Sequence, residues 1–326
     1  MLSDESLERV YSSLELTGVN EDRLVFLCVH GSRLYGTDNA DSDTDIKGVY
    51  VDDLDDIILS RTKKHRKYTS GNSESKNGKD DLDIDLIELR QFLQDALNGQ
   101  PYAIDMLFCS DECTLISDWL WDSIVEAKGK FLSTNIMPFI GYCRHQAAKY
   151  GLKGSRLAAM NEVVETLQGI RRDMKVSELQ LEENEYVKVV ENAGVTKGSF
   201  IQVGRKYYSF SSKVGDMLDS LTKTQKKYGS RSTEAKENRG IDWPAISHAY
   251  RVMFQALTLL RGADIKFPLP EAGYLRRVKS GQVPWNTVNE ELPRLMRIVE
   301  EASISSTLPE QPDREYFDRL VLRYYR

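Results

Sequence analysis

Long hydrophobic runs are absent from this 326-residue sequence. No segment approaches the roughly 20 unbroken apolar residues that a membrane-spanning helix requires. The first ten residues, MLSDESLERV, contain neither the basic stretch nor the apolar stretch of a secretory signal. We therefore expect a cytoplasmic protein that does not bind a membrane.

Cysteine is scarce, and so is any excess of positive charge. The four cysteines include a Cys-x₃-Cys pair, Cys109 and Cys113, but no histidine lies nearby to complete a zinc site. We therefore expect reduced thiols rather than a disulfide framework. The formal net charge of −6 argues against a protein that coats nucleic acid without specificity. The sequence also lacks internal repeats and coiled-coil heptads, which excludes a repeat protein.

The most informative segment is HGSRLYGTDNADSDTDIKGVYV, residues 30–51. The apolar residues 24–29 before it predict a buried strand that ends at Gly31 and Ser32. A chain without a bulky side chain at this turn can open into a helix, whose first backbone N–H groups are suited to binding phosphate. Ser32 could also act as the N-cap of that helix, and the two roles are compatible. Arg33 could face a nucleotide or cover the helix.

Two aspartates follow this turn. Asp43 and Asp45 alternate with Thr44 and Ile46, which places both carboxylates on one face of a strand. Two hard anionic ligands side by side suit Mg²⁺ that also carries the oxygens of a nucleoside triphosphate. The alternative is a solvated acidic turn, since other aspartates lie nearby. The position after a glycine turn and before a β-branched strand favours the metal site.

A second run of alternating acids lies in DDLDIDLIELRQFL, residues 80–93. Asp81, Asp83 and Asp85 alternate with apolar residues, so the three carboxylates share one strand face. The pattern then becomes helical over residues 86–97 and stops at Gly99. We expect one sheet edge that carries acids from two strands.

The Gly-Ser turn followed by Asp-x-Asp resembles the signature of the DNA polymerase β-like nucleotidyltransferase superfamily. The resemblance implies that Gly31 and Ser32 hold the β- and γ-phosphates of a nucleoside triphosphate. It implies that the two aspartates bind two divalent ions, Mg²⁺ or Mn²⁺, with a third carboxylate from a later strand beside the attacking hydroxyl. Asp83 and Asp85 fit that third position about equally well, and Asp81 is expected to stay in water.

The patterns along the chain predict an α+β fold. Alternating helix and strand patterns over residues 1–115 indicate a polymerase-β-like catalytic domain, with helices around a mixed sheet. Residues 116–326 read as a mostly helical nucleotide- or acceptor-binding domain with a small β insert near 184–211. Residues 61–81 lack apolar periodicity and predict a mobile loop.

Basic residues gather outside the acidic segments. We expect nucleotide contacts from Lys153, Arg156 and Arg231, although a solvated basic face is the alternative for the first two. His248 and Arg251 lie three residues apart on one predicted helical face, so they could bind a nucleotide or acceptor. The structural alternative is a satisfied histidine and a surface arginine. The basic run RTKKHRK, residues 61–67, is either a solvated loop or an acceptor-binding segment.

Further segments, among them YGSR, IDWPAISHAYR and GQPYAIDMLF, resemble a branch of that superfamily found in phages and bacteria. The branch is related to predicted RNA-repair nucleotidyltransferases. Gln100, Asp105 and Pro244 depart from its pattern.

The branch implies a magnesium-dependent transferase of the EC 2.7.7 type, in a bacterial cell or a phage-infected host. The enzyme would move a nucleoside monophosphate from an NTP, such as ATP, to a hydroxyl of an RNA end or tRNA, with release of pyrophosphate. The alternatives are an adenylyltransferase of a small molecule or protein, of the antibiotic-modifying or antitoxin type, and a nucleotide-binding regulator without turnover.

Overall fold

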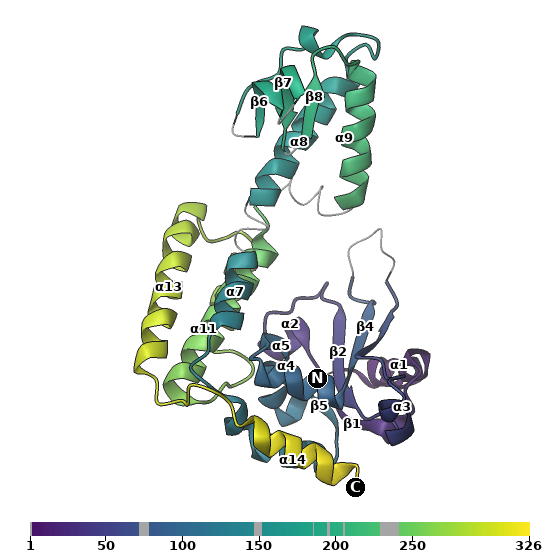
Figure 1. The fold of residues 1–326 in the computed structure, drawn as a ribbon, viewed down its shortest axis with the longest axis vertical. Coiled ribbons are helices and arrows are strands. Elements are labelled where there is room, and N and C mark those ends of the chain that lie inside the picture. The colour runs from purple at the N-terminus through teal and green to yellow at the C-terminus, as the bar shows by residue number, and fades with distance from the viewer. Residues whose placement is uncertain are drawn as a thin grey trace. The chain divides into compact units, whose positions relative to one another are not determined.

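The computed structural model describes residues 2–71, 78–146, 152–184, 186–193, 196–204, 206–228 and 241–326 (Figure 1). The chain forms two compact units. Met1–Cys143 and Ser247–Arg326 make up the first, and Arg144–Ile246 the second. The predicted α+β fold is confirmed. The predicted division into a catalytic domain, 1–115, and a binding domain, 116–326, concerns function and stays a prediction.

A five-stranded mixed sheet forms the centre of the first unit, in the order β3-β4-β2-β1-β5. The parallel pair is β2 with β4, and the other three pairs are antiparallel. The strands are β1 (Leu24–Val29), β2 (Thr44–Tyr50), β3 (His65–Thr69), β4 (Leu82–Glu88) and β5 (Thr114–Ser117).

Helices cover both faces of the sheet and pack against its apolar side chains. Leu27 and Ile46 share one core with Val10 and Leu14 of helix α1. On the opposite face, Phe26 stacks on Trp121 of helix α6 with 3.9 Å between the ring centroids. Because side chains alternate along a strand, Asp45 and Asp83 belong to this second face. The helices nearest the sheet are α1 (Asp4–Leu14), α2 (Gly31–Tyr35), α3 (Leu54–Ile58), α4 (Leu89–Leu97), α5 (Pro101–Leu107) and α6 (Trp119–Glu126).

The predicted mobile loop over residues 61–81 is wrong in part, because His65–Thr69 form β3 at the sheet edge. The remainder of that prediction includes residues 72–77, which lie outside the described residues. The strand has no apolar face of its own, and Lys67 pairs across the sheet with Asp85 of β4. Charged edge strands of this kind discourage pairing with another chain, and a hydrophobic pattern cannot reveal them.

The C-terminal helices complete the first unit. Helix α11 is predominantly apolar. Helix α14 packs against the N-terminal part of the unit, where Phe317 stacks on Phe131 with 3.7 Å between the ring centroids. The C-terminal helices are α11 (Trp243–Gly262), α12 (Ala272–Lys279), α13 (Trp285–Ser305) and α14 (Arg314–Tyr324), and α7 (Met137–Gln146) lies before them in the chain. Among the described residues, no helix combines the length and the apolar character needed to cross a bilayer.

The second unit has its own hydrophobic core, to which Val164, Leu167, Ile201 and Leu221 contribute. Helices α8 (Leu152–Gln168) and α9 (Val214–Tyr228) pack with an antiparallel sheet of β6 (Val187–Ala193), β7 (Thr196–Val203) and β8 (Lys206–Ser209). This sheet is the small β insert that the sequence predicts near residues 184–211.

A buried polar cluster joins α2 and α5 to α11 within the first unit. The Asp105 carboxylate accepts hydrogen bonds from the Tyr35 hydroxyl at 2.8 Å and from Arg251 Nη1 at 3.0 Å. Gln255 Nε2 donates to the other carboxylate oxygen at 2.6 Å. The Arg251 guanidinium also lies over the Tyr35 ring, 4.0 Å from its centroid. The cluster fixes α2, which carries the Gly-Ser turn, against two other helices.

We expect Arg251→Ala to lower the free energy of unfolding by about 3–5 kcal/mol, because the Asp105 carboxylate would stay buried without its cation. His248→Ala is the matched control, since His248 is exposed on the same helix and surface changes usually cost less than about 0.5 kcal/mol. Urea unfolding followed by circular dichroism measures both. An Arg251→Ala loss no larger than that of the control would contradict this role.

Candidate active site

Three carboxylates meet on the second face of the sheet. Asp45 of β2 and Asp83 of β4 are direct neighbours in the parallel pair, and Asp43 immediately precedes β2. One oxygen from each of the three residues lies within 4.8 Å of the others, and all three residues are half-buried. Oxygen ligands at this spacing suit a hard divalent cation.

The three charges disfavour one another. Burial raises the pKa of Asp45 to about 6, from an ordinary value of 3.8, and the charges of Asp43 and Asp83 add to the increase. A cation bound between the carboxylates would remove this penalty. The residues present therefore fit a divalent metal ion.

Gly31 lies against the acidic cluster. Its φ is +62°, and a Cβ atom at this position would lie 1.9 Å from Asp45 Oδ2. The His30 backbone N–H donates to the Asp45 carbonyl oxygen at 2.8 Å, which holds the turn beside β2. Only glycine avoids both the strained backbone and the clash. The turn therefore touches the face of the sheet that carries the three acids.

Ser32 lies in the first turn of α2, and His30 occupies the N-cap position, so the alternative capping role of Ser32 is not seen. Its Oγ atom is buried and has no hydrogen-bond partner among the described residues. Arg33 Nη2 donates to the Ser42 carbonyl oxygen at 3.2 Å, which ties α2 to the loop before β2. A nucleotide contact from Arg33 stays a prediction.

Asp85 has a different environment from Asp83, although both lie on the same face of β4. Asp85 is ion-paired with Lys47 at 3.2 Å, His65 at 3.0 Å and Lys67 at 3.4 Å. Burial acts to raise the pKa of Asp85, but Lys47, His65 and Lys67 outweigh it and hold the pKa below its ordinary value. The structure thus groups Asp83 with Asp43 and Asp45, whereas Asp85 belongs to a neighbouring set of basic residues.

A groove of about 520 Å³ runs along this face and is lined by residues of β2, β3 and β4, including Asp45, Lys47, Lys67, Asp83 and Asp85. Its volume is within the range of small-molecule binding sites.

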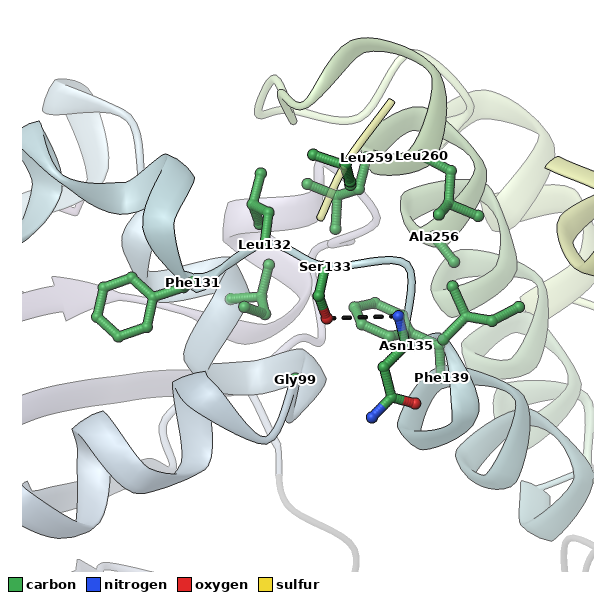
Figure 2. A pocket seen from close by; sticks show the side chains of 12 residues that line it. Gly99, Phe131, Leu132, Ser133, Asn135, Phe139, Ala256, Leu259 and Leu260 are labelled. Atoms are coloured by element: carbon green, nitrogen blue, oxygen red, sulfur yellow. Dashed lines mark hydrogen bonds between the residues drawn. The ribbon is translucent and has the colours of Figure 1, made fainter. Parts of the chain in front are cut away.

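The cavity in Figure 2 differs in kind from this groove. It measures about 30 Å³ and lies among apolar side chains that include Phe131, Phe139 and Leu259. Its one hydrogen bond among the residues drawn joins the Asn135 backbone N–H to Ser133 Oγ at 3.3 Å. That space holds only one or two water molecules. The groove beside the acids is therefore the stronger candidate for a substrate site.

The basic residues predicted to contact nucleotide have separate outcomes. Lys153 and Arg156 belong to α8, but their side chains and the whole of Arg231 lie outside the described residues. His248 is exposed, whereas Arg251 is buried in the cluster around Asp105. The contacts of Arg251 make it part of the fold, and a nucleotide contact from Arg251 stays a prediction. A nucleotide contact from His248, Lys153, Arg156 or Arg231 stays a prediction.

Sequence reasoning missed Lys47 and Tyr102, and it named His65 only as part of the basic run 61–67. Lys47 Nζ lies 5.1 Å from the centroid of the Tyr102 ring, as well as beside Asp85. The available signal was the spacing of the two residues, because Lys47 follows Asp45 by two positions along β2. That spacing places Lys47 on the same strand face as Asp45, and therefore beside the acids of β4 once the two strands pair.

Comparisons with known proteins agree with this geometry. The family model described as the RNA repair pathway DNA polymerase beta family matches residues 3–184. An uncharacterized 38.9 kDa protein from the nrdC-mobD intergenic region of Enterobacteria phage T4 is 34% identical over 319 residues, covering 90% of this chain and 95% of the phage protein.

A nucleotidyltransferase-like protein from Exiguobacterium sibiricum, solved at 1.90 Å, matches 91% of this chain and 73% of its own. Its identity is 10% and its TM-score is 0.26, which is too distant a likeness to carry a conclusion. The family model and the phage relative are sufficient, since each spans more than half of the chain. This chain therefore belongs to the RNA repair pathway DNA polymerase beta family, within the polymerase β-like nucleotidyltransferases.

Proposed function

We propose that this protein is a metal-dependent nucleotidyltransferase that moves a nucleoside monophosphate from an NTP to a hydroxyl of an RNA end or tRNA and releases pyrophosphate. The observation that carries the proposal is the meeting of Asp43, Asp45 and Asp83 beside the Gly31 turn. The description of the matching family, which names RNA repair, favours an RNA acceptor.

Asp43, Asp45 and Asp83 would hold Mg²⁺ or Mn²⁺, and we propose two ions, because each carboxylate has a second oxygen to offer. The bound cations would neutralise charge on the triphosphate and lower the pKa of the acceptor hydroxyl. Two cations would also remove the repulsion that raises the pKa of Asp45. A binding module without turnover would gain nothing from concentrating like charges in this way.

The chain's own residues position the reactants. Gly31 leaves room for the triphosphate to approach Asp45, and the Ser32 hydroxyl can donate a hydrogen bond to a phosphate oxygen. The acceptor oxygen then bonds to the α-phosphorus, and the bond to pyrophosphate breaks. Little covalent chemistry falls to the protein, so alignment and charge neutralisation supply most of the acceleration.

The direct test is incubation of the protein with each labelled NTP, Mg²⁺ or Mn²⁺ and total cellular RNA. We expect label in RNA and equimolar pyrophosphate with the wild-type protein, and neither with Asp43→Ala or Asp45→Ala. If label appeared only on protein or on a small molecule, that molecule would be the acceptor in place of RNA. Absence of pyrophosphate with every NTP and both metals would contradict nucleotidyl transfer itself.

The two aspartates of β4 should behave differently. Asp83→Asn removes a proposed metal ligand, and we expect kcat to fall at least about a hundredfold, as on loss of one charge-stabilising group in other enzymes. Asp85→Asn leaves all three proposed ligands in place, so we expect a change in the KM of the acceptor with kcat largely retained. Steady-state kinetics with varied acceptor separates the two. A low kcat for Asp85→Asn together with an active Asp83→Asn would reverse the assignment.

The metal-free protein should be stabilised by Asp45→Asn at pH 7.5. The folded-state pKa of Asp45, about 6, exceeds the ordinary 3.8, so its ionisation destabilises the fold progressively as pH rises through that interval. The penalty is complete above it and is on the order of 2–3 kcal/mol. Asp45→Asn should therefore raise Tm in EDTA at pH 7.5 and have little effect near pH 4.

Asp85→Asn is the matched control for this measurement and should lower Tm at pH 7.5, because the charge of Asp85 is paired with Lys47 and His65. Added Mg²⁺ should raise the Tm of the wild-type protein more than that of Asp45→Asn. A metal-free Tm at pH 7.5 that falls equally in both variants would show that the Asp45 charge carries no penalty.

A further inference from the structure

A second row of charged side chains crosses the sheet beside the three acids. The register pairs Lys47 of β2 with Asp85 of β4, and Asp85 with Lys67 of β3. This row, Lys47–Asp85–Lys67, is two residues further along β2 and β4 than Asp45 and Asp83, and therefore on the same face. His65, also on β3, reaches Asp85 from the far side of the row. The two rows line the same groove of about 520 Å³.

The basic groups of this row outnumber its single carboxylate. Both lysine ammonium groups approach Asp85 Oδ2, at 3.2 and 3.4 Å, while His65 Nδ1 lies 3.0 Å from Oδ1. A lysine ammonium has three N–H donors, so its contact with Asp85 leaves donors that can reach into the groove. The Lys67 side chain is 66% exposed, which makes it accessible to a ligand. The row thus offers an anion site next to a cation site.

The positions of the two sites separate them on the sheet. The Gly31 turn follows β1, on one side of β2, whereas Lys67 lies on β3, beyond β4 on the other side. Asp45 on β2 and Asp83 on β4 stand between the turn on the β1 side and Lys67 on β3. A triphosphate held at Gly31 and Ser32 would approach the acids from the β1 side, which leaves the β3 side open to the second substrate.

We propose that the Lys47–Asp85–Lys67 row binds a backbone phosphate of a single-stranded nucleic acid acceptor and thereby places its terminal hydroxyl at the three acids. The inference rests on the proposed function. Two residues along a strand span about 7 Å, and a single ribose separates a terminal hydroxyl from the nearest phosphate of its strand. Asp85 holds the two ammonium groups together and offsets their repulsion.

The basic run 61–67 contains residues inside the proposed phosphate site and residues outside it. Lys67 lines the groove, and His65 contacts Asp85. Lys64 is exposed on the connection before β3 and is not among the residues that line the groove. Lys67→Gln and Lys64→Gln therefore remove the same charge from neighbouring positions, one inside the proposed phosphate site and one outside it.

The test measures the affinity of the full-length protein for a fluorescent single-stranded RNA oligonucleotide with free terminal hydroxyls, by anisotropy over a series of salt concentrations. For single strands, each phosphate contact contributes about 0.7 to the slope of log K against log salt. We expect Lys67→Gln to weaken binding and reduce the slope by about 0.7, and Lys64→Gln to match the wild-type protein. Equal melting temperatures would show that both variants are folded.

A second arm measures binding of a non-hydrolysable ATP analogue with Mg²⁺, which Lys67→Gln should leave unchanged. A loss of analogue binding in Lys67→Gln would assign the lysine to the triphosphate and overturn the proposal. Equal losses of RNA binding in Lys67→Gln and Lys64→Gln would show that only the total charge matters, which would overturn the proposal. Failure of the wild-type protein to bind RNA would overturn it as well.

These outcomes are distinct from failure of the proposed function. Nucleotidyl transfer is tested by pyrophosphate release in the presence of RNA, whereas the acceptor site is tested by RNA affinity, which requires no turnover. A protein that binds RNA through Lys67 but never releases pyrophosphate would retain this site and lose the proposed reaction.

Discussion

The parallel pairing of β2 with β4 is the constraint on which the candidate site depends. Its register sets Asp45 beside Asp83 and Lys47 beside Asp85. A shift of one residue would send one strand's charged side chains to the opposite face, where Ile46 and Ile84 are now buried. The apolar core therefore enforces the register, and the register holds like charges together although they repel one another. The site is assembled by burial of hydrophobic residues on the other side of the sheet.

The same strands place opposite electrostatic demands next to each other. One row consists of carboxylates whose mutual repulsion a cation would relieve, and the next row holds lysines around a single carboxylate. Because the two rows are only about 7 Å apart, the charges of each row contribute to the electrostatic potential at the other. Transfer of a nucleotide between two anionic substrates calls for such an arrangement, since both partners must approach closely without repelling each other.

Much of this could be predicted from the sequence. The strand over residues 24–29, the glycine turn, the alternating acids and the β insert all follow from local periodicity, and the structure contains each of them. The identity of the third acid did not follow, because Asp83 and Asp85 have the same local pattern and differ only in their cross-strand neighbours. Similarly, the sequence suggests that Arg251 binds a nucleotide or acceptor or lies on the surface, while its partner Asp105 is 146 residues away. Long-range pairing of polar groups leaves no periodic signal.

The distance along the chain between Asp105 and Arg251 has a consequence for biosynthesis. At elongation rates of about 5–20 residues per second, the 146 residues between them take on the order of 7–30 s to synthesise. At the start of that interval β1 to β4, the glycine turn and the three acids have been synthesised, but α11 has not. Until α11 is synthesised, the hydrogen bond between Tyr35 and Asp105 lacks the guanidinium that contacts both residues. The nascent chain therefore carries the sheet with the three acids long before it can complete the cluster that fixes the Gly31 turn, and a chain terminated before α11 has the acids without that cluster.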